Sequence, residues 1–118
     1  MALEPLNRLA RATVVSLIGL RDVYRAEAAF RQELLVLLLV IPTAWLLTST
    51  GVERALLIGS WMLVLVVEML NSAIEAAVDR IGAERHELSR KAKDFGSAAV
   101  FCAIVLSVTV WILVLFSA

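Results

Sequence analysis

The final part of the chain, Ser97–Ala118, contains no Asp, Glu, Lys or Arg in twenty-two consecutive residues. A helix needs about 20 mostly apolar residues to cross the hydrocarbon core of a bilayer. A second run, Leu34–Thr50, meets the same requirement. A third run, Ala55–Val78, reaches that length only by including Glu68 and Glu75. The sequence therefore predicts an all-α integral membrane protein with three transmembrane helices.

The composition supports this class and excludes several others. Of the 118 residues, 61% are apolar, whereas about 45–50% is usual for soluble domains. Eleven basic residues balance eleven acidic ones, which argues against binding to nucleic acid. The only cysteine, Cys102, excludes an internal disulfide. We expect one membrane domain over residues 1–118.

The segment before the first apolar run has the pattern of an amphipathic helix at the membrane surface. Its apolar and charged residues fall on opposite faces at helical spacing. The apolar set is Leu6, Leu9, Ala10, Leu17, Leu20 and Tyr24, and the charged set is Arg8, Arg11 and Asp22. We predict a surface helix over residues 6–27, spans over 30–50, 54–81 and 95–118, and a cytoplasmic loop over 82–94.

Basic residues predict the orientation of the chain. Five arginines lie within residues 1–33 and five basic residues lie within 80–93, whereas the short connection 51–54 holds only Arg54. Cytoplasmic segments of membrane proteins carry the excess of Lys and Arg. We therefore expect the N-terminus and the second connection to lie in the cytoplasm and the C-terminus outside.

A polar stripe within the second span is the strongest functional signal. Glu68, Ser72, Glu75 and Asp79 are spaced by 4, 3 and 4 residues, and Asn71 lies beside them, so they share one helix face. Carboxylates at membrane depth face a protein interior or a wet cavity. Because three helices of this length offer little interior, we infer an oligomer. A metal ligand, a general base and a proton relay all fit these carboxylates. Asn71 and Ser72 taken alone also fit simple helix–helix contacts.

Two further segments deliver charged groups to the same membrane face. Residues 26–33 read AEAAFRQE and residues 80–96 read RIGAERHELSRKAKDFG. The second segment alone fits an ordinary basic cytoplasmic loop, and a lone histidine such as His86 is commonly solvated. Together with the stripe, the two segments favour a charged site at the cytoplasmic interface.

Three stretches carry a resemblance to a known family. They are EAAFRQE at Glu27–Glu33, VEMLNSAIEAAVDRIG at Val67–Gly82 and HELSRKAKDFGSAAV at His86–Val100. With the three-span layout, they make the chain similar to the small membrane-integral diacylglycerol kinases of bacteria, from about Arg8 onward.

This resemblance implies a homotrimer in the bacterial cytoplasmic (inner) membrane. The activity implied is transfer of the ATP γ-phosphate, with Mg2+, to the free hydroxyl of diacylglycerol, which gives phosphatidic acid. It also implies active sites that are shared between subunits and open to the cytoplasmic interface.

The resemblance further implies roles for individual residues. Glu68 matches the proposed base, and Glu27 and Glu75 match the magnesium ligands. The residues that match the nucleotide site are Arg8, Glu27, Glu75, Glu84, His86, Lys93 and Asp94. The residues that match the lipid pocket are Ala29, Phe30, Arg31, Gln32, Glu33, Glu68 and Ser97.

The chemistry of the residues agrees with these roles. Magnesium accepts one or two carboxylates together with phosphate oxygens. Glu68 lies about 10 Å along the helix axis from Glu75, two turns deeper, where a lipid hydroxyl can reach it. Asn71 is expected to hold the Glu68 carboxylate or the hydroxyl, and Lys93 and Arg8 to offset phosphate charge.

The sequence departs from the family at three positions. Val15 stands where some members have an aromatic residue. Arg85 replaces a frequent aromatic residue, and it either adds a phosphate contact at the nucleotide site or is inert. Pro42 belongs to no family motif, and we expect it to kink the first span.

Three alternatives stay open at this stage. A related branch of the family phosphorylates undecaprenol. A proton-conducting subunit would use Glu68 and Glu75 as relay sites, and a structural assembly subunit would use Asn71 and Ser72 for helix contacts. The segment AFRQE favours the diacylglycerol branch.

Overall fold

The computed structural model describes residues 3–82 and 86–117, which form four helices. Helix α1 spans Glu4–Ala26, α2 Ala28–Leu47, α3 Gly51–Ile81 and α4 Glu87–Phe116. Helices α2, α3 and α4 are long and apolar enough to cross a membrane. The prediction of an all-α protein with three candidate spans after an N-terminal helix is confirmed.

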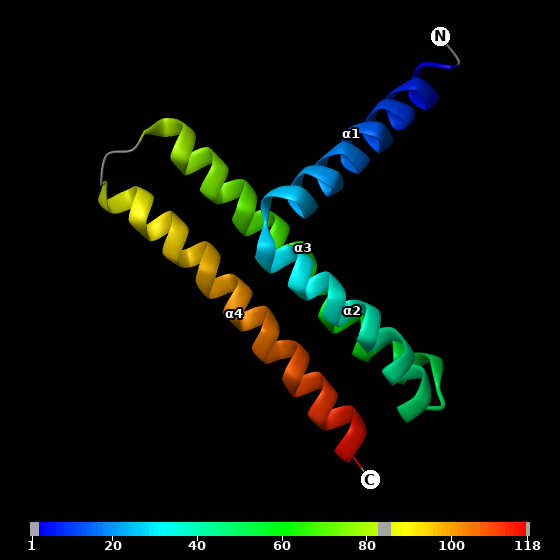
Figure 1. Cartoon of the computed structure of the whole chain (residues 1–118). Helices are drawn as coiled ribbons and strands as arrows, with labels where there is room; N and C mark the ends of the chain where they lie inside the picture. Colours follow the sequence, from blue (N-terminus) through cyan, green and yellow to red (C-terminus); the bar gives the residue numbers. More distant parts are fainter. Residues whose placement is uncertain (1–2, 83–85, 118) are drawn as a thin grey trace.

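Helix α3 is the centre of the arrangement. It contacts both α2 and α4, while α1 extends away from the other three helices (Figure 1). Its 31 residues make it about 46 Å long, which exceeds a hydrocarbon core of about 30 Å. One end of α3 must therefore project beyond the apolar layer. Most large apolar side chains on the four helices are exposed, as expected for surfaces that face lipid.

The break between α1 and α2 falls at one residue. Glu27 has an extended backbone, with φ −114° and ψ 111°, which separates the two helices. Arg31 Nη1 donates to the carbonyl oxygens of Tyr24 at 2.7 Å and Arg25 at 3.0 Å. These bonds satisfy carbonyls that the end of α1 would leave unpaired.

The turn between α2 and α3 lies at residues 48–50, a little before the connection that the sequence suggested. Thr50 caps α3, because its Oγ1 accepts from the Glu53 backbone N–H at 3.2 Å. Arg54 Nη2 donates to the Thr48 carbonyl at 2.9 Å, and the guanidinium lies 3.9 Å from the centre of the Trp45 ring.

Helix α4 begins earlier than expected. The sequence predicts a loop over 82–94, yet residues 87–94 form the first two turns of this helix. His86 Nδ1 accepts from the Leu88 backbone N–H at 3.0 Å and caps the helix. Arg90 then pairs with Glu87 and Asp94 on the same helix face. Glu84 and Arg85 lie outside the described residues.

The other boundaries also move by a few residues. The helices cover 4–26, 28–47, 51–81 and 87–116, against predictions of 6–27, 30–50, 54–81 and 95–118. Pro42 lies inside α2, which continues to Leu47. A proline inside a membrane helix is tolerated because neighbouring groups satisfy the carbonyl that it frees.

Candidate active site

The polar stripe of α3 faces the protein rather than lipid at its deepest part. Glu68 is 7% exposed and Asn71 8% exposed, although both are strongly polar. Ser72, one turn after Glu68, and Glu75, one turn after Asn71, are half-buried. Asp79, at the end of the stripe, is exposed. The stripe therefore runs from a buried carboxylate to an open surface.

Glu68 and Glu75 of this stripe form a cluster with Glu27 and Glu33, which lie outside α3. We call these four glutamates the acid cluster. Glu27, at the α1–α2 break, and Glu75, on α3, lie close enough to Glu68 for their negative charges to repel its own. Glu68 likewise repels the carboxylate of Glu33 on α2. Within residues 3–82 and 86–117, no ion pair neutralises any of the four. Buried carboxylates without a cation are costly, so the cluster is suited to bind one.

The amide of Asn71 is directed at the metal-ligand candidate rather than at the expected base. Its Nδ2 donates to Glu75 Oε1 at 3.4 Å, and its Oδ1 is buried without a hydrogen-bond partner. Glu33 Oε2 is likewise buried without a partner. Glu33 and Asn71 thus each hold a buried oxygen that can still accept a hydrogen bond.

The carboxylates of the acid cluster fit magnesium only together with ligands from outside the chain. In the described part of the chain, no three His, Cys, Asp or Glu side chains are grouped closely enough to hold a metal by themselves. Glu27 and Glu75 can supply two carboxylates, and magnesium usually takes one or two from protein and the rest from phosphate and water.

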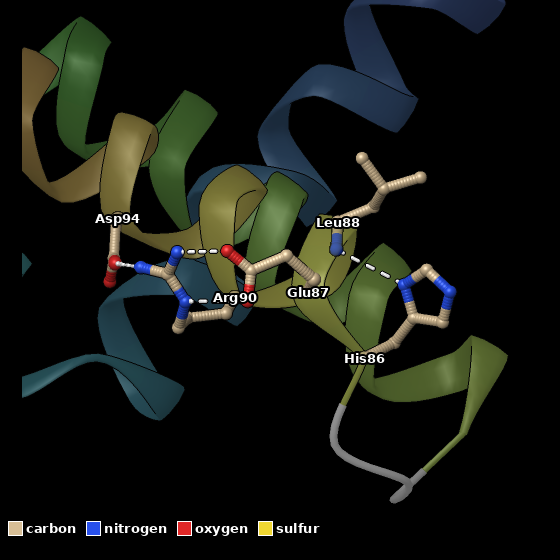
Figure 2. Close-up of polar contacts among 5 residues, drawn as sticks. All are labelled: His86, Glu87, Leu88, Arg90 and Asp94. Atoms are coloured by element: carbon tan, nitrogen blue, oxygen red, sulfur yellow. Dashed lines mark hydrogen bonds and ion pairs between the residues drawn. The ribbon is translucent and has the colours of Figure 1, made fainter.

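One ion pair joins the end of α3 to the start of α4, and two more lie within the start of α4. Lys93 Nζ lies 2.6 Å from Asp79 Oδ1 and its charge also acts on Glu75. Arg90 Nη1 lies 2.8 Å from Asp94 Oδ2, and its other nitrogens contact Glu87 (Figure 2). These side chains are exposed, so an incoming phosphate can compete for Lys93 and Arg90.

The expected lipid residues have different positions. Phe30 is buried and packs with Leu37 and Leu65 in the core, and Arg31 caps α1. Ala29, Gln32 and Ser97 are exposed. The backbone of Glu33 is held by Trp61 Nε1, which donates to its carbonyl at 2.8 Å.

A groove of about 580 Å³ between α1 and α3 was not predicted. It is open and mostly apolar, and Glu27 and Ser72 are among its few polar lining residues. It is lined by Ser16, Gly19, Leu20, Asp22, Val23, Ala26, Glu27, Met69, Ser72 and Ala73. The small residues Gly19 and Ala26, seven apart on α1, are the sequence signal that would have indicated it.

One expected nucleotide residue is not brought to the cluster. Arg8 is exposed on α1, 19 positions before Glu27, which places it about 28 Å away along the helix axis. Val15, where some relatives have an aromatic residue, is also exposed on α1. The chain by itself therefore places Arg8 far from Glu27 and Glu75.

Comparison with known proteins gives a consistent result. Residues 14–115 match the family model for prokaryotic diacylglycerol kinase. The chain is 53% identical over 111 residues to a diacylglycerol kinase of Escherichia coli K12, covering 94% of this chain and 91% of that protein. It is 50% identical over 110 residues to the diacylglycerol kinase of Pseudomonas aeruginosa, covering 93% and 89%. The chain belongs to the prokaryotic diacylglycerol kinase family.

Proposed function

We propose that this protein is a membrane-embedded kinase that transfers the γ-phosphate of ATP to the free hydroxyl of diacylglycerol. The observation that carries the proposal is a buried carboxylate, Glu68, which lies near Glu27, Glu33 and Glu75, while none of the four forms an ion pair within the described residues. The family to which the chain belongs and the names of its relatives support the same activity.

Glu68 is the proton acceptor in the proposed reaction. The lipid hydroxyl oxygen attacks the γ-phosphorus, and the bond from that phosphorus to the bridging oxygen of ADP breaks. The hydroxyl proton passes to Glu68, and the products are phosphatidic acid and ADP. A positioned general base of this kind accelerates a reaction by about 10²–10⁴-fold.

Glu27 and Glu75 hold the magnesium that accompanies ATP. The metal, when bound, neutralises charge on the phosphate oxygens. Lys93 is close enough to Glu75 for its charge to act there, and it is free to exchange Asp79 for a phosphate oxygen. We assign Asp94, His86, Glu84 and Arg85 to the surroundings of the nucleotide.

The groove between α1 and α3 is the proposed seat of the lipid. Its apolar walls suit an acyl chain, and the polar residues Glu27 and Ser72 in its lining suit the glycerol hydroxyl, which then lies toward Glu68. Ala29, Gln32 and Ser97 are exposed and available to the lipid.

We further propose that the active protein is a homotrimer in the bacterial inner membrane, with its site open to the cytoplasm. The position of Arg8 supports a shared site, because it is about 28 Å from Glu27 along its own helix and needs a neighbouring chain to reach a nucleotide. The basic N-terminal segment and the basic start of α4 support the orientation.

The decisive experiment offers diacylglycerol and undecaprenol side by side to purified protein with labelled ATP and Mg2+. Labelled phosphatidic acid is the expected product. Faster labelling of undecaprenol would reassign the substrate, and no labelling of either alcohol would reject the kinase. A nucleotide-independent proton flux in liposomes, lost in Glu68→Gln, would favour the proton-conducting alternative.

Mixed trimers test the shared site. Arg8→Ala and Glu68→Gln chains are each expected to be weakly active alone. Assembled together, they should regain a fraction of wild-type activity, because some sites then combine an intact Arg8 with an intact Glu68 of another chain. No recovery would place both residues in one chain's site.

A further inference from the structure

Gly96 of α4 lies directly against the side chain of Asn71 on α3. Gly96 is buried, and a Cβ added there would overlap Asn71 Oδ1 and lie 3.2 Å from Asn71 Cγ and 3.6 Å from Ile74 Cδ1. Nothing lies within 4 Å of a Cβ added at Gly51 or Gly59. The absence of a side chain at Gly96 is thus what lets α4 approach the polar stripe.

The contact determines which way the Asn71 amide points. Its Oδ1 faces Gly96 and has no hydrogen-bond partner, while its Nδ2 donates to Glu75 Oε1 at 3.4 Å. No hydrogen bond therefore holds the oxygen end of the amide. Packing against the bare backbone of Gly96 keeps that end in place and directs the donor end at Glu75.

We propose that Gly96 is a positioning residue that acts through Asn71 on Glu75. Because Glu75 is a magnesium ligand only in the function proposed above, the inference rests on that function. Gly96 sets the orientation of the Asn71 amide, and the amide N–H holds Glu75 Oε1 in the orientation that receives the cation. A larger residue at position 96 turns the amide away and loosens the Glu75 carboxylate.

Side-chain amide spectra of the metal-free protein test the structural half of the proposal. The sequence contains only two asparagines, Asn7 and Asn71. Selective ¹⁵N labelling of asparagine therefore gives two NH₂ signals, and Asn7, exposed on α1, is an internal reference. Gly96→Ala is expected to shift the Asn71 signal alone, and the control Gly51→Ala to shift neither. An unmoved Asn71 signal in Gly96→Ala would overturn the proposal.

Magnesium titration of the kinase tests the functional half. Loss of a group that orients a metal ligand typically costs 10–100-fold in metal affinity. We expect Gly96→Ala to raise the Mg2+ concentration for half-maximal activity at least tenfold, with most of the maximal rate regained at high Mg2+. A merely structural defect would lower the maximal rate at every Mg2+ concentration, and that result would overturn the proposal.

A double variant keeps the test decisive if Gly96→Ala does not fold. Asn71→Ala removes the side chain that the new methyl group would meet, so Asn71→Ala/Gly96→Ala has room to pack. The double variant should need the same Mg2+ concentration as Asn71→Ala alone. A higher requirement would show that Gly96 acts independently of Asn71. Wild-type protein without lipid-kinase activity would reject the proposed function, whereas the amide spectra would still decide the role of Gly96.

Discussion

The two ends of α3 differ in how many of the buried polar groups around them have hydrogen-bond partners. Near the α2–α3 turn, Trp111 Nε1 donates to the Leu57 carbonyl at 3.1 Å, and the hydroxyls of Ser60 and Ser107 are 3.0 Å apart. Arg54 Nη2 also finds a carbonyl there, although its Nε stays buried without a partner. Apart from Arg54 Nε, the polar atoms of these side chains have hydrogen-bond partners.

At the opposite end, around the acid cluster, the balance is reversed. Glu33 Oε2 and Asn71 Oδ1 are buried without partners, and Glu68 has two like charges acting on it. Unpaired buried polar groups cost stability. In the proposed function, substrate or metal binds at this end, whereas the paired groups of the turn end hold the helices together.

Removing the base is the sharpest way to break this comparison. We expect Glu68→Gln to lower the rate of phosphatidic acid formation by about 10²–10⁴-fold. The amide is close in size to the carboxylate, so the helices should still pack. Labelled ATP in mixed micelles measures the loss, and circular dichroism checks that the helices remain. Activity near wild type would reject Glu68 as the proton acceptor.

The next effect concerns the proposed metal ligand. Glu75→Gln should raise the Mg2+ requirement by about 100-fold, the upper end of the range for groups that only orient a ligand. A chelator should abolish wild-type activity, and added Mg2+ should restore it. Glu53→Gln, an equal change at the turn end of α3, is the control and should leave the Mg2+ titration unchanged. Equal titrations for both variants would contradict the assignment of Glu75.

A smaller effect is expected at the start of α4. Lys93→Met should raise the KM for ATP by about tenfold, since a hydrogen bond to a charged group contributes about 1.5–3 kcal/mol. Stability should change by less than about 1 kcal/mol, because the Lys93–Asp79 pair is 44% and 66% exposed. Lys91→Met, on an exposed position nearby, is the control. A loss of stability without a change in KM would make Lys93 a structural residue.

The smallest effect belongs to the turn end. Ser107→Ala removes the contact with Ser60, whose hydroxyl still donates to the Leu57 carbonyl at 3.2 Å. Interhelical hydrogen bonds in membranes average about 0.6 kcal/mol, so the free energy of unfolding measured in detergent should fall by about that amount. Kinase activity should stay within twofold. Thr109→Ala, whose hydroxyl bonds only to its own helix at Val105, should shift unfolding less.

Much of the candidate site was predictable because it lies on one helix. Glu68, Asn71 and Glu75 share a face by spacing alone, and the structure confirms that this face is buried at Glu68 and Asn71. Arg31 shows where such reasoning stops. It lies in a motif expected to line a lipid pocket, yet its guanidinium caps α1, because the chain breaks at Glu27 and leaves carbonyls unpaired.

The sequence also placed the end of the second connection too late, because α4 begins at Glu87. The charges of residues 87–94 suggested a loop, but charged residues at i, i+3 and i+4 also stabilise a helix, and His86 supplies its cap. The groove between α1 and α3 and the contact of Gly96 with Asn71 depend on two helices meeting. No periodicity within one segment reports such a meeting.

The sequence by itself determined the number of apolar helices, the amphipathic start and the polar face of α3, because each follows from the pattern of residues within one segment. Only the tertiary structure decided that Asn71 turns to Glu75, that Arg31 caps α1, and that Gly96 allows α4 to approach. These outcomes depend on which helices lie side by side and on which carbonyls their ends leave unpaired.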